Sequence, residues 1–247
     1  MDRDEGAICR GELRLSQPRS GYRFNVDSLL LADFASRSLP EDPAGRILDL
    51  GAGCGVVGLL LARRSPGLQV TLVEIQQELA CLARHNAGVN GLQERVEVLN
   101  EDLRTLELRW PERPSLAVCN PPFYRVGQGR LNPDPQAAMA RHELACTLDD
   151  LCRCAGRLLA RDGKVCLVHI MERRDEVLAS LHAAGLRPRA WRRILPTPGR
   201  DARRFLIMAR RGGGAEIEEL PALVERERHG GYTEEMKRIL REEEGTP

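Results

Sequence analysis

The sequence predicts an α/β fold in which helices cover both faces of a mostly parallel β-sheet. Short β-branched and apolar runs of strand length alternate regularly with longer segments of helical apolar spacing. The strand-like runs are of the buried type, which is typical of parallel sheets whose crossover helices cover both faces. A chain of 247 residues is long enough for one such domain with an appended segment.

Seven segments have the length and the apolar, β-branched composition of strands. They are residues 46–51, 69–74, 95–102, 115–120, 164–170, 187–195 and 203–209. The first run, RILDLG, stops at a glycine, and the second, QVTLVE, ends on an acid. Because ligands of parallel sheets bind at the carboxyl ends of the strands, we expect a functional site at these ends.

Helical segments are predicted between these strands. They cover residues 57–64, 76–91, 148–160 and 172–184. In the second of them, Leu79, Leu82 and Ala83 fall on one helical face, and Asn90-Gly91 ends the helix. Regular alternation of this kind is the pattern of strand–helix–strand units.

A further helix is predicted near the N-terminus, in the sequence YRFNVDSLLLADFA. We expect it to begin at Asp27 or Ser28, which are both favourable N-cap residues, because the apolar run 29–31 follows. This helix precedes the first strand of the sheet, so Phe24, Asn25 and Asp27 are candidates for the rim of the ligand site. The alternative for Asp27 is that it only caps the helix.

The composition excludes several classes of protein. The 37 Lys and Arg residues balance 36 Asp and Glu, so the total charge of +1 does not indicate a polyanion-binding protein. The eight cysteines lack zinc-site spacing, which predicts reduced core residues and no metal. No apolar run reaches 18 residues, and the charged N-terminus is unlike a signal peptide. We therefore expect a cytoplasmic protein that does not contact a membrane.

A glycine-rich turn follows the first predicted strand, in the sequence LDLGAGCGVVG. Gly51, Gly53 and Gly55 lack a Cβ atom, so the backbone there can approach a ligand closely. A dinucleotide-binding turn needs Gly or Ala at the sixth position counted from Gly51, where this chain has Val56. The turn indicates a ligand site, but the NAD fingerprint is not met.

Three carboxylates stand at or beside successive strand ends: Asp49, Glu74 and Asp102. A carboxylate that ends the second strand is placed to bind both hydroxyls of a ribose, and Asp102 is placed to accept from an adenine amine. Asp49 beside the glycines suits an ammonium group and would repel a diphosphate. S-adenosylmethionine combines these features and is the predicted cofactor. The alternative is that the three acids are ordinary solvated side chains.

The fourth predicted strand ends in the sequence AVCNPPFY. Asn120 offers a side-chain carbonyl, and the prolines Pro121 and Pro122 hold the chain extended with a free backbone carbonyl. Two such acceptors can bind both hydrogens of a planar amino group and direct its lone pair toward a methyl donor. Phe123 and Tyr124 can stack on a flat base. The alternative is a strand-ending turn with aromatic residues in the core.

These motifs resemble those of the class I S-adenosylmethionine-dependent methyltransferases that act on amino groups, whose catalytic motif is [DNS]-P-P-[FYW]. Within this class, QPRSGYRFNVDSLLLADF (17–34) and MARHE (139–143) are similar to the bacterial tRNA1(Val) adenine-N6 methyltransferases. The resemblance covers about residues 12–210. It implies a Rossmann-like fold with a mostly parallel, seven-stranded sheet.

The resemblance also implies ligands and residue roles. The cofactor it implies is S-adenosylmethionine, and the substrate is adenosine 37 of tRNA1(Val), bound at residues 120–123. The cofactor would be held by Gly51, Gly53, Glu74 and Asp102. Arg141 and His142 are expected to bind substrate phosphate or to brace the catalytic loop, with a solvated helix start as the alternative.

The near-neutral total charge hides a basic stretch and an acidic segment. Residues 187–211 contain nine arginines and one acid, whereas residues 216–244 contain ten Glu and five Lys or Arg. Arginines interleaved with aromatic residues are typical of phosphate contact and base stacking. We therefore predict that Arg203 and Arg204 contact tRNA. Exposed arginines that serve only solubility are the alternative.

The expected domain organisation follows from these patterns. Residues 1–211 form the predicted methyltransferase domain, in which 12–45 contribute to the substrate and cofactor rim. Residues 212–247 are expected to be an acidic tail, joined through the glycine-rich sequence RRGGGAE (210–216). The oligomeric state stays open at this stage.

Several other functions remain compatible with the sequence. Amino-group methyltransferases also act on guanine-N2 of ribosomal RNA, on adenine in DNA and on the glutamine of release factors. The glutamine-modifying relatives typically have Tyr where this chain has Phe123, and they carry an added N-terminal helical domain. An NAD-dependent oxidoreductase is disfavoured by the glycine spacing and by Asp49. An RNA-binding module without activity is disfavoured by the intact NPPF motif.

Overall fold

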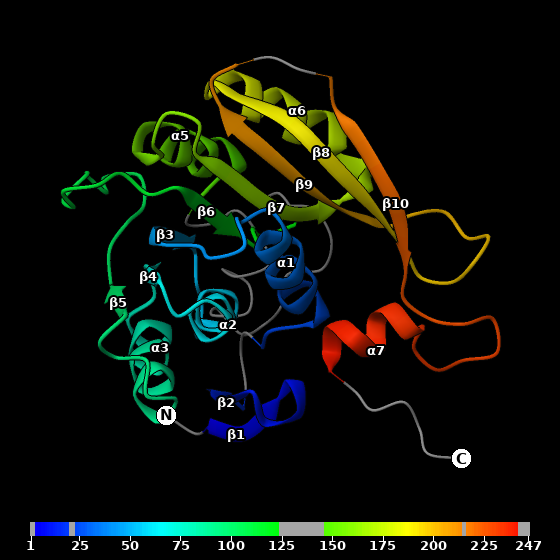
Figure 1. Ribbon diagram of the computed structural model, residues 1–247, viewed down its shortest axis with the longest axis horizontal. Coiled ribbons are helices and arrows are strands. Elements are labelled where there is room, and N and C mark those ends of the chain that lie inside the picture. Colours follow the sequence, from blue (N-terminus) through cyan, green and yellow to red (C-terminus); the bar gives the residue numbers. More distant parts are fainter. Residues whose placement is uncertain (1–2, 20–22, 124–145, 214–215, 242–247) are drawn as a thin grey trace.

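A computed structural model describes residues 3–19, 23–123, 146–213 and 216–241 of the chain (Figure 1). Its central feature is an eight-stranded sheet in the order β10-β8-β9-β7-β6-β3-β4-β5. The strands are β3 (Gly45–Leu50), β4 (Leu68–Val73), β5 (Val96–Leu99), β6 (Leu116–Cys119), β7 (Lys164–Ile170), β8 (Leu186–Leu195), β9 (Arg204–Arg211) and β10 (Glu218–Val224). Only β9 runs antiparallel to its neighbours in this sheet. The predicted mostly parallel sheet is confirmed, with one strand more than the seven expected.

Helices cover both faces of the sheet (Figure 1). One face carries α1 (Val26–Arg37), α2 (Val56–Arg64) and α3 (Gln77–Val89); the other carries α5 (Leu148–Leu158), the 3₁₀ turn η2 (Met171–Arg173) and α6 (Arg174–Ala183). Along β3, Ile47 belongs to the first core and Leu48 to the second. Successive side chains of a strand point to opposite faces, so a strand covered on both sides is apolar throughout.

A two-stranded antiparallel hairpin precedes this domain and was not predicted from the sequence. It consists of β1 (Arg3–Ile8), the 3₁₀ turn η1 (Cys9–Gly11) and β2 (Leu13–Pro18). Buried Asn86 on α3 accepts from the backbone amide of Ser16 at 2.7 Å and donates to its carbonyl at 2.9 Å. The same side chain donates to the carbonyl of Cys54 at 2.9 Å. One amide therefore fastens the hairpin to the glycine turn.

The segment predicted as an acidic tail contributes to the core of the fold. Its strand β10 pairs in parallel with β8, and helix α7 (Glu234–Leu240) packs against α1 (Figure 1). Met236 and Ile239 of α7 are buried in the same core as α1. Part of the acidic charge is used internally, because Glu235 pairs with Arg192 at 2.7 Å.

The predicted start of the first helix was wrong by one or two residues. Helix α1 begins at Val26, and its N-cap is Asn25, whose Oδ1 accepts from the amide of Asp27 at 3.0 Å. The backbone of Asn25 is extended, as an N-cap requires. Neither Asp27 nor Ser28 caps the helix, and both side chains make other contacts, which bear on the site.

Candidate active site

The glycine turn joins β3 to α2 at the carboxyl edge of the sheet. Gly51, Gly53 and Gly55 have φ angles of 73°, 58° and 92°, in the region that favours glycine. The amide of Gly51 donates to the carbonyl of Val73 over 2.9 Å, which fixes the turn to β4. A Cβ atom on Gly55 would lie 2.9 Å from Leu72, so this position also lacks room for a side chain.

Asp49 lies beneath the glycine turn. Its carboxylate is 2% exposed and accepts from the amide of Gly58, in the first turn of α2, at 2.8 Å. Burial raises the pKa of Asp49 to about 7, although the hydrogen bond from Gly58 acts in the opposite direction. Asp49 does not line the main pocket but a small cavity beside it, which is also lined by Ser28 and Asn120.

Glu74 follows β4 and holds the glycine turn from the other side. Its Oε2 atom accepts from the amide of Gly53 at 2.8 Å, and its Oε1 atom accepts from the amide of Gln76 at 2.8 Å. Burial raises the pKa of this carboxyl, while the two backbone hydrogen bonds lower it. The carboxylate is thus fixed at the wall of the main pocket.

Asp102 stands after β5 on the opposite wall of the pocket. Its carboxylate forms an ion pair with Arg104 at 2.6 Å and accepts from the Arg104 amide at 2.9 Å. These contacts lower the pKa of Asp102, so the side chain is ionised at neutral pH. Both it and Glu74 present a carboxylate to the pocket.

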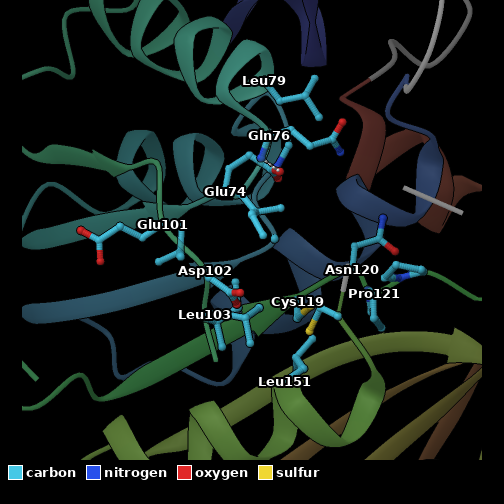
Figure 2. A pocket seen from close by; sticks show the side chains of 17 residues that line it. Glu74, Gln76, Leu79, Glu101, Asp102, Leu103, Cys119, Asn120, Pro121 and Leu151 are labelled. Carbon is cyan, nitrogen blue, oxygen red and sulfur yellow. Dashed lines mark hydrogen bonds between the residues drawn. The ribbon is translucent and has the colours of Figure 1, made fainter. Parts of the chain in front are cut away.

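The main pocket lies where β3, β4 and β6 end, and it encloses about 730 Å³ of empty space including its open mouth. Figure 2 shows Glu74, Asp102 and Asn120 around it, each supplied by a different strand end. Its apolar lining includes Ile75, Leu79, Leu103, Cys119, Pro122 and Leu151. A largely apolar pocket with a few convergent polar groups is typical of a small-molecule site.

Asn120 occupies the end of β6, where the main pocket meets the small cavity. Its Nδ2 atom donates to the Oγ atom of Ser28 in α1 at 3.2 Å. Ser28 is only 3% exposed, so this contact is fixed inside the fold. Among the described residues, none donates a hydrogen bond to Oδ1 of Asn120. In this part of the chain, the carbonyl end of the amide thus has no donor of the protein.

Phe123 is held by His169 of β7 and by Arg173 of the 3₁₀ turn η2 that follows it. Its ring centroid lies 5.4 Å from that of His169, at an angle of 45°, and its carbonyl accepts from Arg173 at 3.2 Å. Both partners are buried, and Arg173 also pairs with Glu176 at 2.6 Å. Burial lowers the pKa of His169 to about 4, so the imidazole is neutral at pH 7. These contacts define the last described position of the NPPF loop.

Comparisons with known proteins agree with this geometry. Residues 26–174 match the family model "Methyltransferase small domain". The chain is 32% identical to the tRNA1(Val) (adenine(37)-N6)-methyltransferase of Aeromonas hydrophila, over 86% of each chain. It is also 32% identical to the protein of the same name from Bacteroides thetaiotaomicron, over 91% of each chain. The chain belongs to the tRNA1(Val) (adenine(37)-N6)-methyltransferase family.

Solved structures support the same fold for the methyltransferase. A predicted O-methyltransferase from Agrobacterium tumefaciens is 27% identical, with a TM-score of 0.67, and the alignment covers 87% of this chain and 96% of that one. The predicted class I methyltransferase fold is confirmed. Two further structures of this fold, 15% and 16% identical to the chain, were solved with S-adenosyl-L-homocysteine and with sinefungin.

The two arginines that were predicted to contact tRNA have different surroundings in the methyltransferase. Arg204 forms ion pairs with Asp27 of α1 and with Glu225, and only 18% of its side chain is exposed. Its guanidinium is therefore engaged inside the protein, which does not support a direct contact with RNA. Arg203 is exposed at the same edge of the sheet as Asn120. The other predicted substrate residues, Tyr124, Arg141 and His142, lie outside the described residues.

Three residues of the site in the methyltransferase were not predicted from the sequence. Ser28 was considered only as a helix cap, and His169 and Arg173 were not singled out. Each contacts the NPPF loop from a segment at least 46 residues away in sequence. The sequence HIMERR (169–174) carries no motif, so only the tertiary arrangement identifies these residues.

The eight cysteines of the methyltransferase are free thiols, and six of them are buried. Within the described ranges, no group of three or more His, Cys, Asp or Glu side chains is arranged to hold a metal ion. No helix of the described residues has both the length and the apolar character that crossing a membrane requires.

Proposed function

We propose that this methyltransferase methylates the N6 amine of adenosine 37 in tRNA1(Val). The observation that carries the proposal is the Asn120 amide, whose nitrogen is bonded to Ser28 and whose oxygen is open at the junction of the two cavities. Relatives with this activity in their names match the chain over most of its length. Because tRNA is the substrate, we place the activity in the cytoplasm.

The residues around the main pocket fit the cofactor. Glu74 is fixed by two backbone amides, and the remaining lone pairs of its carboxylate suit ribose hydroxyls. Asp102 is an acceptor for the adenine amine, and the apolar lining suits the flat ring. Gly51 and Gly53 bring backbone to the pocket wall without side chains. When bound, S-adenosylmethionine supplies a methyl group on a positively charged sulfur.

The NPPF loop would present the substrate amine. Oδ1 of Asn120 and the backbone carbonyl of Pro121 are the two acceptors for the hydrogens of N6. Accepting both hydrogens withdraws the nitrogen lone pair from the ring and orients it along the direction of attack. The proton of the amine can leave after transfer, so none of these residues has to act as a strong base.

Phe123 would bind the base itself. Its ring rests against His169, and its backbone is held by Arg173, so the aromatic face has a fixed support. Stacking on an aromatic ring offsets part of the cost of removing a base from its loop, at about 1–3 kcal/mol per base. The neutral state of His169 at pH 7 keeps this support free of charge.

The test is transfer of labelled methyl from S-adenosylmethionine to tRNA1(Val) transcripts carrying either adenosine or guanosine at position 37. We expect N6-methyladenosine only in the first transcript. Asn120→Ala should abolish transfer, whereas Asn120→Asp keeps an acceptor oxygen and should retain part of the activity. Ribosomal RNA, DNA and a release factor serve as competing acceptors. Label on one of these, and none on tRNA, would contradict the proposed substrate.

A further inference from the structure

The arginines of the basic stretch 187–211 fall into two groups. In five of them the guanidinium group contacts an acceptor of the protein, in the interior or at the surface: Arg192 with Glu235, Arg193 with Glu219, Arg204 with Asp27 and Glu225, Arg210 with Asp162, and Arg211 with the carbonyl of Leu159. The other four have no side-chain partner among the described residues: Arg187, Arg189, Arg200 and Arg203. Of these four, Arg187, Arg200 and Arg203 are exposed, whereas Nη1 of Arg189 is buried.

Two of the four unpartnered arginines lie at the carboxyl edge of the sheet, where the site is. Arg200 and Arg203 belong to the 196–203 loop, which joins β8 to β9, and both are exposed. This loop lies at the carboxyl edge because β9 pairs antiparallel to β7, with Arg204 opposite Ile170 at the end of β7. Arg187 is exposed at the opposite edge, near the start of β8.

A second loop with exposed arginines lies beside the first (Figure 1). It covers residues 225–233 and follows β10. The amide of Glu225 donates to the carbonyl of Leu195 at 2.9 Å, and the amide of Arg226 donates to that of Pro196 at 3.1 Å. Arg226 and Arg228 are exposed, and neither pairs with a carboxylate of the described residues. The two loops therefore form one continuous surface.

The second loop also offers a flat stacking surface. The guanidinium of Arg226 lies over the ring of Tyr232, 4.6 Å from its centroid. Arg226 is exposed to solvent. RNA bases stack on arginine planes as well as on aromatic rings, and arginine donates to phosphate in the same region. An acidic protein partner would pair with the arginine charges but would not stack on the flat guanidinium of Arg226. The surface therefore fits RNA better.

An ion-pair cluster connects this surface to the methyl-transfer site. Arg204, which begins β9, bridges Glu225 of the second loop and Asp27 of α1. The next residue of α1, Ser28, holds the amide of Asn120. The two loops are thus fixed at the same edge of the sheet as the NPPF motif.

We propose that the loops 196–203 and 225–233 together form an RNA-binding surface that holds the substrate tRNA next to the NPPF motif. Among the described residues, the two loops carry four exposed arginines without a carboxylate partner and two exposed acids, Asp201 and Glu227, which is an excess of two positive charges. Arg200, Arg203 and Arg228 contact phosphates, and the Arg226–Tyr232 pair stacks on a nucleotide. This inference rests on the proposed function, because it requires an RNA substrate.

The test compares two double charge reversals in the full chain. Arg200→Glu/Arg228→Glu changes the proposed surface, and Arg161→Glu/Arg187→Glu makes the same change in net charge with exposed, unpaired arginines at the opposite edge. We expect the first variant to bind tRNA1(Val) at least about tenfold more weakly, with a shallower salt dependence, because phosphate contacts are lost. The second should bind within about twofold of the wild type.

Cofactor affinity, measured by calorimetry, is expected to be unchanged in both variants and reports on intact folding. Two outcomes would contradict the proposed RNA-binding surface: unchanged tRNA binding by Arg200→Glu/Arg228→Glu, or an equal loss of binding in the two variants. If binding is unchanged, an acidic protein becomes the partner to test. Arg226→Lys keeps the charge but removes the plane, and we expect it to weaken binding as well. The binding assay does not depend on methylation, so failure of the proposed activity is detected separately.

Discussion

At the residue scale, Ser28 decides which end of the Asn120 amide faces the pocket. An asparagine amide has two ends of similar size but opposite hydrogen-bonding character. With Nδ2 bonded to Ser28, the carbonyl oxygen is directed away from α1. An amide that rotates freely would present its NH2 group to the substrate amine for part of the time. Both groups are donors, so the substrate amine would not be polarised.

We therefore expect Ser28→Ala to reduce kcat about tenfold, which corresponds to the loss of one buried hydrogen bond. Substrate KM and the Kd for S-adenosylmethionine should stay near the wild-type values, because Ser28 does not line the main pocket. Ser28→Thr keeps the hydroxyl and is expected to recover most of the rate. Steady-state kinetics on tRNA checks both variants. An equal loss of rate in the Thr variant would mean that packing of α1, and not the hydroxyl, supports Asn120.

Ser28 and Asn120 also show which parts of the site could be predicted from the sequence and which could not. Glycines, strand-end acids and the NPPF motif are local patterns, and the structure brings Gly51, Glu74, Asp102 and Asn120 to one pocket. Ser28 lies 92 residues from Asn120, and its contact depends on how α1 packs against the sheet. No local pattern contains that information. Arg204 was predicted from charge alone, and charge does not reveal which arginines pair inside the protein.

At the element scale, Asp49 couples β3 to the first turn of α2. Its folded pKa of about 7 lies above the ordinary value of 3.8, because burial disfavours the charged form. Between these two pH values the folded state keeps a proton that the unfolded state has lost, so stability falls as the pH rises from about 4 to about 7. Above pH 7 both states are ionised and this contribution no longer changes.

Asp49→Asn should remove this contribution. We expect the free energy of unfolding of the variant, relative to wild type, to increase between pH 5 and pH 8 by a few kcal/mol at most. Urea unfolding of both proteins at several pH values measures this difference in free energy. The other titrating groups are the same in the two proteins, so their contributions cancel. A difference between the two proteins that does not change with pH would show that Asp49 is already ionised in the folded protein at pH 5.

The three strands that the sequence missed share one property. β1, β2 and β10 lie at edges or outside the main sheet, and β10 has a single buried side chain, Leu223, with Pro221 in its middle. None of the three has the continuous apolar run by which central strands are found: β1 is largely exposed, β2 is interrupted by polar residues, and β10 contains a proline. Central strands such as β3 and β7 were predicted nearly to the residue for the opposite reason.

At the scale of the whole molecule, the cluster of Asp27, Arg204 and Glu225 joins three distant parts of the chain. It connects the N-terminal helix α1, the antiparallel strand β9 and the loop after β10. All three side chains are largely buried, with exposed fractions of 2%, 18% and 14%. Removing one member of a buried ion-pair cluster leaves the remaining charges unpaired in the interior. This lowers the free energy of unfolding more than replacing the whole cluster with neutral side chains does.

We expect Arg204→Met to lower the free energy of unfolding by about 3–5 kcal/mol, since two carboxylates lose their shared partner. Neutralising those partners in Asp27→Asn/Arg204→Met/Glu225→Gln should restore much of the stability, because no unpaired charge then remains. Urea unfolding of the two variants separates this electrostatic cause from a loss of packing. If the triple variant is no more stable than Arg204→Met, the aliphatic part of Arg204, and not its charge, holds the C-terminal loop to α1. A restored triple variant would instead show that charge pairing joins β9 and the 225–233 loop to the helix that positions Asn120.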